Sequence, residues 1–325
     1  MSGGVKQVLN RRQHGGKALV SDFFSGLLHT LAWLGKRSPS ARRRLKATRC
    51  QRGLTYGPHG EKNTLDIYRA EPPREGAQAT VLYLHGGGFR ILSKESHWSF
   101  ALQLVELGYT VVLPNYRLSG DAACPAALED AAAALEWCLD NAEQEAIDPS
   151  QLLIAGESAG GNLCMMLTQL CLERGPTPWA QRLFDRGWVP AAQVPLCPFA
   201  QLRDAERYRG LIPDFYIKRI RFLAESYLAE SAAPELGEPL LRLESELPFA
   251  RQMPPTFLSV GGRDPILNDS ERCAAALEAQ GVPHRYHFAP NGHHAFQASL
   301  WGPSARDFWA CLADFLREHQ LPPAP

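Results

Sequence analysis

Hydrophobic residues gather in short runs along the chain, and longer amphipathic segments separate these runs. Two short β-like stretches come first, over 54–57 and 64–68. The later runs are apolar on both faces, which is typical of strands buried in a parallel sheet, and they cover 79–84, 109–115, 152–156, 191–197, 256–262 and 285–289. Helical patterns lie between them over 125–143, 159–172, 270–281 and 303–319. This alternation predicts an α/β fold with an open, mostly parallel sheet and helices on both faces.

Two segments do not follow the alternation. Residues 198–250 carry charged and aromatic stretches without a clear new strand, which predicts a helical insertion between two strands. Residues 21–35 carry an apolar helical face between the N-cap candidate Ser21 and Gly35. At about fifteen residues this helix is shorter than the ~20 residues that span a bilayer. We expect a helix that covers another part of the molecule, as a flap over a binding cleft would; a helix packed on the main domain and an interfacial anchor are the other interpretations.

Charge is unevenly distributed, although the 325 residues have a formal net charge of zero. Residues 1–50 hold eleven Lys and Arg against the single acidic residue Asp22. A basic surface segment on an acidic body is one interpretation, and contact with an anionic membrane surface is the other. The neutral total offers no general field for nucleic acid, so no nucleic-acid partner is expected.

The eight cysteines are scattered and form no CxxC pair, which argues against a zinc or thioredoxin-like site. No signal peptide pattern opens the chain, because its first apolar stretch follows about twenty polar and glycine-rich residues. Reduced, buried thiols and a cytoplasmic location are expected.

The strongest chemical signal is the stretch GESAG over 156–160, which stands between a buried strand and a helical pattern. G-x-S-x-G in this context places its serine at the tip of a sharp strand-to-helix turn, so Ser158 is the predicted nucleophile. The positive end of the following helix would favour an anion formed there.

A serine hydroxyl needs a base, and the base needs an orienting carboxylate. The best candidate bases are His293 and His294, which follow the last strand and which the pattern alone does not separate. Asp264 directly follows the preceding strand, where open α/β sheets present their ligands. Asp269 is the second choice, and we expect it to cap the following helix together with Ser270.

Three glycines follow His85 at the end of a buried strand. Acyl transfer builds a negative oxygen in the transition state, and backbone N–H groups must reach that oxygen without a side chain in the way. A glycine run facing the nucleophile turn meets this need, and no phosphate-binding glycine motif follows a strand here.

Together these motifs resemble those of the hormone-sensitive-lipase-type carboxylesterases, a family of α/β-hydrolases. The resemblance covers about residues 52–320 and rests on HGGGF (85–89), NYRL (115–118) with PAALEDA (125–131), GESAGGN (156–162), DPILND (264–269) and HAF (294–296). It departs from the family at Glu157, where many relatives carry Asp.

The resemblance implies the α/β-hydrolase fold and a role for each matched residue. Ser158, Asp264 and His294 would form the catalytic triad, so that His294 is preferred over His293. The N–H groups of Gly87, Gly88 and Ala159 would form the oxyanion hole, and His85 would steady the glycine loop. The family also builds a helical cap, which implies residues 1–50 as a cap segment and 51–325 as the hydrolase domain with 198–250 inserted.

The expected activity is hydrolysis of short- to medium-chain, small-molecule esters with no metal or organic cofactor. It should fall as the pH drops through ~6–7, where a histidine base becomes protonated. Hydrolysis of aryl formamides or amides by the same triad is the first alternative. A non-catalytic, ligand-binding protein of this fold is the second.

Overall fold

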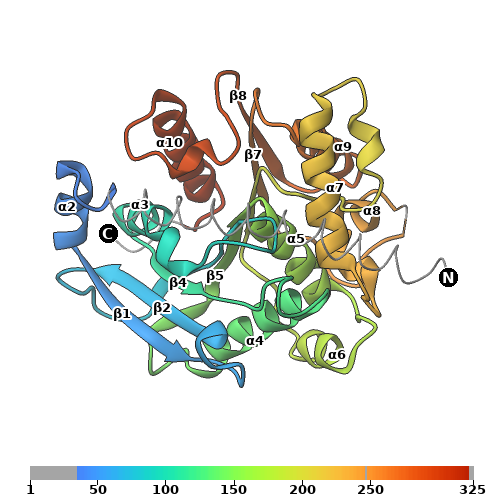
Figure 1. Cartoon of the computed structure of the whole chain (residues 1–325). Helices are drawn as coiled ribbons and strands as arrows, with labels where there is room; N and C mark the ends of the chain where they lie inside the picture. The colour runs from blue at the N-terminus through green and yellow to red at the C-terminus, as the bar shows by residue number, and fades with distance from the viewer. Residues whose placement is uncertain (1–34, 246, 322–325) are drawn as a thin grey trace.

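The computed structural model describes residues 35–245 and 247–321, with an eight-stranded sheet at their centre and helices on both faces of it (Figure 1). The strands are β1 (Thr48–Thr55), β2 (Thr64–Ala70), β3 (Gln78–Leu84), β4 (Thr110–Pro114), β5 (Ile147–Glu157), β6 (Gln193–Leu196), β7 (Thr256–Gly261) and β8 (His284–Ala289). The α-helices are α2 (Pro39–Lys46), α3 (Trp98–Glu106), α4 (Ala126–Asp140), α5 (Ala159–Leu172), α6 (Pro178–Asp185), α7 (Asp214–Leu228), α8 (Pro239–Leu243), α9 (Leu267–Ala279) and α10 (Pro303–Glu318). This is the α/β architecture that the sequence predicts.

The strand order places the predicted functional loops at one edge. The order is β1-β2-β4-β3-β5-β6-β7-β8, in which β2 is antiparallel to β1 and β4 and all other neighbours are parallel. The carboxyl ends of β3, β5, β6, β7 and β8 therefore lie along the same edge. Open α/β sheets bind their ligands at this edge.

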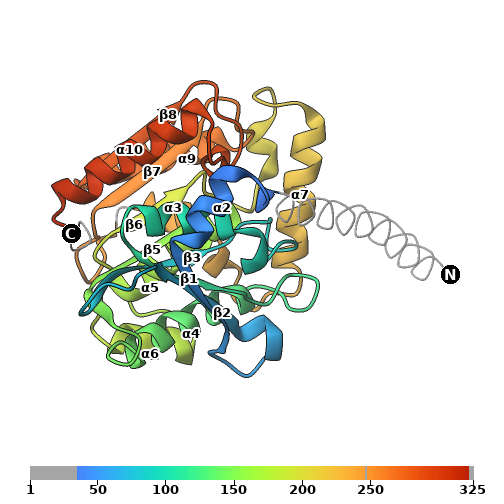
Figure 2. The same cartoon turned by 90° about the vertical axis from the view of Figure 1, so that its left-hand side faces the viewer.

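Alternating side chains of β3 explain why helices cover both faces of the sheet. Val81 and Tyr83 pack into the core that holds residues of α3 and α10, whereas Leu82 and Leu84 pack into the core that holds residues of α4, α5 and α6. All seven residues of β3 are buried, as expected for a strand with no solvent-facing side. Two views show α10 on one side of the sheet and α4 and α6 on the other (Figure 1, Figure 2).

The segment between β6 and β7 holds α7 and α8, and no strand is present among its described residues. The first turn of α9 anchors this segment. The Asp269 carboxylate is fully buried and accepts hydrogen bonds from the backbone N–H groups of Ala200 (3.0 Å) and Gln201 (3.1 Å) and from the Arg207 side chain (2.9 Å).

The expected start of this helix is wrong. The helix begins at Leu267, so Asp269 and Ser270 lie inside it and do not cap it. The Asp269 side chain accepts hydrogen bonds from N–H groups of the segment between β6 and β7 instead of those of its own helix.

The amino-terminal end differs from the expected boundary. β1 begins at Thr48 and pairs with β2, so the central sheet starts within the basic segment assigned to residues 1–50. The amphipathic helix expected from Ser21 lies outside the described residues. None of the described helices has the length and apolarity that crossing a membrane requires. All eight cysteines are unpaired, as expected.

Candidate active site

Ser158 occupies the turn between β5 and α5. Its φ of 57° and ψ of −117° are strained for a residue with a side chain, and such strain is typical of functional positions. The turn is sharp because Gly160 lies against the end of β3: a Cβ there would approach the carbonyl oxygen of Leu84 to 2.0 Å. The turn leaves the Ser158 side chain half-buried on the wall of a cavity.

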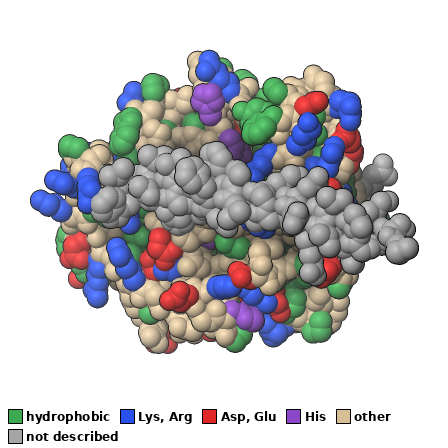
Figure 3. Space-filling model, in the orientation of Figure 1, with side chains coloured by type: hydrophobic (Ala, Val, Ile, Leu, Met, Phe, Trp, Pro, Cys, Tyr) green, Lys and Arg blue, Asp and Glu red, His purple; other side chains and the backbone are tan. Residues whose placement is uncertain are grey.

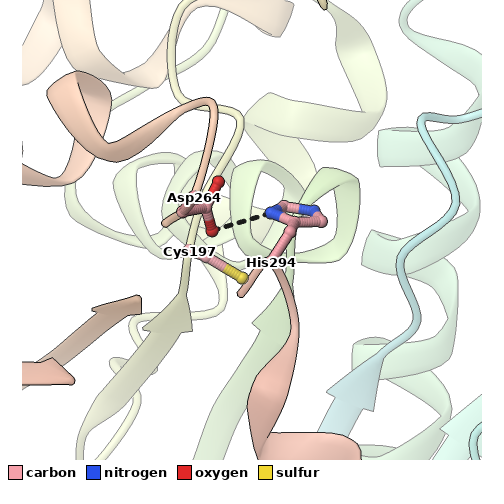
Figure 4. A group of neighbouring side chains, drawn as sticks. All are labelled: Cys197, Asp264 and His294. Carbon is pink, nitrogen blue, oxygen red and sulfur yellow. Dashed lines mark hydrogen bonds and ion pairs between the residues drawn. The ribbon is translucent and has the colours of Figure 1, made fainter. Parts of the chain in front are cut away.

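The loops after β7 and β8 bring Asp264 and His294 together. The Asp264 side chain is fully buried, and its Oδ2 lies 2.8 Å from Nδ1 of His294, whose side chain remains 35% exposed (Figure 4). The neighbouring His293 is exposed, and its side chain makes no such contact with the described residues. The structure thus distinguishes the two histidines that the sequence pattern leaves equivalent, because only His294 contacts Asp264.

The glycine loop after β3 presents free backbone donors. Gly87 has a φ of 120°, and a Cβ at this position would lie 2.0 Å from the carbonyl oxygen of Ile91. Among the described residues, no acceptor takes a hydrogen bond from the N–H of Gly87 or Gly88. Ala159 is the first residue of α5, where N–H groups lack partners within the helix.

One cavity of about 500 Å³ connects these parts. Its wall includes Gly87, Gly88, Ser158 and His294, and most of its remaining side chains are apolar. One side of it is formed by α7, through Tyr216, Arg219, Ile220 and Leu223. A larger hollow of about 810 Å³ beside α8 and α9 contains none of the predicted site residues.

Comparison with known proteins identifies the family. The model of a family described as having the alpha/beta hydrolase fold matches residues 81–298. The chain belongs to the α/β-hydrolase family. The hydrolase is 33% identical to the proposed acetyl-hydrolase LipR of Mycobacterium tuberculosis, over 90% of this chain and 86% of that protein. It is 29% identical to esterase LipI of the same organism, over 74% of this chain and 72% of that protein.

Solved structures agree on the fold. Esterase B from Lactobacillus rhamnosis superposes with a TM-score of 0.79 at 19% identity, covering 96% of the hydrolase and 97% of that chain. An esterase/lipase from an uncultured bacterium superposes with a TM-score of 0.71 at 24% identity, covering 92% of the hydrolase and 91% of that chain. The family resemblance and the α/β-hydrolase fold predicted from the sequence are confirmed, and the hydrolase is an enzyme of the carboxylesterase type.

The contact with Asp264 sets the charge state of His294 in the hydrolase. Burial works against the charged imidazolium, but the Asp264 carboxylate, the neighbouring Cys197 and their hydrogen bonds outweigh burial and raise the pKa of His294 well above 6.5. A histidine with this raised pKa becomes protonated at a higher pH than the ~6–7 range expected from the sequence.

Glu157 links the nucleophile turn to the glycine loop. Its buried carboxylate accepts hydrogen bonds from the Gly86 N–H (2.5 Å), the Tyr83 hydroxyl (2.8 Å) and Nε2 of His97 (2.7 Å). Burial opposes charge on both partners, yet the ion pair lowers the pKa of Glu157 and raises that of His97. Tyr83 and His97 both contact the Glu157 carboxylate. The sequence did not reveal these contacts, because they join segments that are distant along the chain.

His85 supports the same loop from the other side. Its ring stacks on Tyr116 at 4.1 Å between centroids, and its Nδ1 donates to the carbonyl oxygen of Gly86 at 2.8 Å. Burial, together with the nearby His97, lowers the pKa of His85 to about 3, so the imidazole stays neutral. A neutral ring in this position suits a structural role.

Cys197 lies beside the His294–Asp264 pair and was not predicted as a site residue (Figure 4). One donor atom from each of the three residues lies within 4.8 Å of the others, a set that can hold a transition metal. Burial raises the pKa of the Cys197 thiol, however, and a metal would have to displace the proton between His294 and Asp264. The group therefore fits a hydrogen-bonded pair with a neutral thiol neighbour better than a metal centre.

Proposed function

We propose that this hydrolase is a serine carboxylesterase that cleaves short- to medium-chain esters of small molecules. The observation that carries the proposal is the meeting of three parts on one cavity: the strained Ser158, the His294–Asp264 pair and the unpartnered N–H groups of the glycine loop. The esterase names of the relatives support the same substrate class.

In the proposed mechanism, the Ser158 hydroxyl attacks the ester carbonyl carbon while His294 takes its proton as general base. Asp264 accepts a hydrogen bond from Nδ1 of His294, which leaves Nε2 free to act and stabilises the imidazolium that forms. The imidazolium then protonates the departing alcohol. Water, activated by the same histidine, hydrolyses the acyl-enzyme and restores the Ser158 hydroxyl.

The developing oxyanion would be bound by the N–H groups of Gly87, Gly88 and Ala159. The free donors on the glycine loop and at the first residue of α5 support this role. Each such donor contributes about 2.7–4 kcal/mol to lowering the barrier in well-studied acyl-transfer enzymes. The α5 dipole adds a favourable field at the same point.

The proposal includes a domain organisation and a location. Residues 198–250 form a cap insertion over the hydrolase domain, which the α7 side chains on the cavity wall support. In this proposal the residues that precede β1 (1–47) form the remaining cap segment. A cytoplasmic location fits eight unpaired cysteines, most of them buried.

The test is hydrolysis of p-nitrophenyl esters across a series of acyl chains, with Ser158→Ala beside the wild type. We expect the variant to lose essentially all activity, because it lacks the proposed nucleophile that forms the acyl-enzyme. Ser150→Ala is the matched control, since this serine is exposed near the other end of β5. Equal rates in wild type and Ser158→Ala at every chain length would refute the proposed nucleophile.

A further inference from the structure

Two arginines share one aromatic neighbour, and one of them lines the cavity that holds Ser158. Arg219 of α7 forms part of the cavity wall, and Arg90 follows the glycine loop. Their guanidinium carbons lie 5.7 Å and 5.5 Å from the ring centroid of Phe222. The Phe222 ring thus lies next to a positive group from each of two separate segments.

No carboxylate neutralises these two cations among the residues that the structure describes. Arg90 donates one hydrogen bond to the Ser226 hydroxyl (3.1 Å), while its buried Nε has no partner. Arg219 forms no ion pair with any described side chain. Arg221, two residues further along the same helix, does pair with Glu206. The surface over α7 carries several basic side chains in the space-filling view (Figure 3).

This arrangement is unfavourable without an anion. Partial burial and the like charge of Arg90 lower the pKa of Arg219. Cation–π attraction to the Phe222 ring offsets part of the unfavourable burial and repulsion of the two guanidinium groups. Both groups, however, share this single ring. A guanidinium binds a carboxylate through two parallel hydrogen bonds, and such a bound anion would offset the remaining repulsion.

We propose that Arg219, supported by Arg90, binds a carboxylate on the substrate, so that the preferred substrates are esters that carry a carboxylate group. The inference rests on the proposed esterase function and narrows its substrate class. Arg219 and Ser158 face the same cavity of about 500 Å³, so a single small molecule can reach both. The apolar walls between them suit the hydrocarbon part of such a molecule.

The experiment compares esters that differ only in the presence of a carboxylate. Mono-4-nitrophenyl adipate and 4-nitrophenyl hexanoate test a carboxylate on the acyl side. 4-Butyryloxybenzoate and 4-butyryloxybenzamide test one on the alcohol side. We expect a higher kcat/KM for the charged member of at least one pair, and increased salt should reduce this preference.

The deciding variant is Arg219→Gln. It should lower kcat/KM for the preferred carboxylate ester by about tenfold to a hundredfold, the range for a hydrogen bond to a charged group, mainly through KM. The uncharged partner ester should lose much less kcat/KM than the carboxylate ester does, since it makes no ionic contact with Arg219. Arg219→Lys should keep part of the preference. Arg221→Gln is the matched control on the same helix and should change neither ester.

The outcomes separate the inference from the proposed function. If the uncharged esters are hydrolysed through Ser158 but Arg219→Gln lowers both members of each pair equally, Arg219 only supports packing and the inference is overturned. The esterase function then stands. If no ester is hydrolysed in a Ser158-dependent way, the proposed function fails and the inference fails with it.

Discussion

The reactivity of single residues here depends on what each one contacts. His294 is more than one-third exposed on one side, while its Nδ1 lies against the fully buried carboxylate of Asp264. The negative charge of Asp264 stabilises the imidazolium form of His294 by more than partial burial destabilises it. The proposed base is therefore a stronger base than a free histidine.

The pH dependence of kcat/KM follows from this contact. Only the neutral imidazole can accept the Ser158 proton, and its pKa lies well above 6.5 in the folded protein. Activity should therefore rise with pH through a midpoint above 6.5 and should be lost below it. Asp264→Asn should move the midpoint downward and lower kcat by orders of magnitude, since the tautomer is no longer held. A flat profile between about pH 5 and 9 would contradict a histidine base.

At this scale the sequence predicts residues that sit in local motifs and misses those defined by distant contacts. Ser158 is predictable because its strand, turn and helix are consecutive. The choice of His294 over His293 rests on family resemblance in the sequence and on a 2.8 Å contact in the structure. Cys197 directly follows β6 between the strands that carry Ser158 and Asp264, and only the strand order reveals that position.

Two elements of the fold are joined by a buried ion pair. Glu157 ends β5 and His97 precedes α3, and the side chains of both are less than one-tenth exposed. The carboxylate also receives the Gly86 N–H, so the pair connects the nucleophile turn with the glycine loop. Its strength should depend on pH, because both partners must be charged.

The contribution of this pair to stability should be greatest between pH 4.5 and 6.5. The raised pKa of His97 gives stability that is present below 6.5 and is lost as the pH rises through the folded value. The lowered pKa of Glu157 gives stability that is present above 4.5 and is lost as the pH falls.

His97→Gln should therefore reduce the free energy of unfolding by about 3 kcal/mol near pH 5.5 and by clearly less near pH 9. Urea unfolding of the wild type and the variant at each pH measures this decrease in the free energy of unfolding. The exposed His59→Gln is the control and should cost little at either pH. Equal costs of His97→Gln at both pH values would show that the pair is not ionised.

The elements themselves were largely predictable, with instructive exceptions. The buried strands of the parallel sheet stand out as apolar runs. The helix α3 was not predicted, because seven of its nine residues are buried and leave no polar face to mark a helical period. The first turn of α9 was missed because Asp269 resembles a capping residue locally but bonds to Ala200 and Gln201 in the folded chain.

The shape of the whole molecule determines which substrates can reach Ser158. The inserted segment holds α7 against the carboxyl edge of the sheet, and the cavity lies between them. Leu223 of α7 lies directly over the glycine loop, since a Cβ on Gly88 would come within 2.8 Å of its side chain. Neither the size of this space nor its wall could be predicted from the sequence, because both depend on how the insertion packs.

Leu223→Ala should lengthen the acyl chain that the enzyme accepts. Removing a half-buried side chain from the cavity wall creates room next to the oxyanion loop without touching the proposed triad. Across the p-nitrophenyl ester series, the chain length of maximal kcat/KM should increase relative to wild type. Leu228→Ala is the matched control, because Leu228 lies on the same helix but faces a different hollow. An unchanged profile in Leu223→Ala would mean that the acyl chain binds away from α7, on the side of the cavity formed by Phe100 and Ala298.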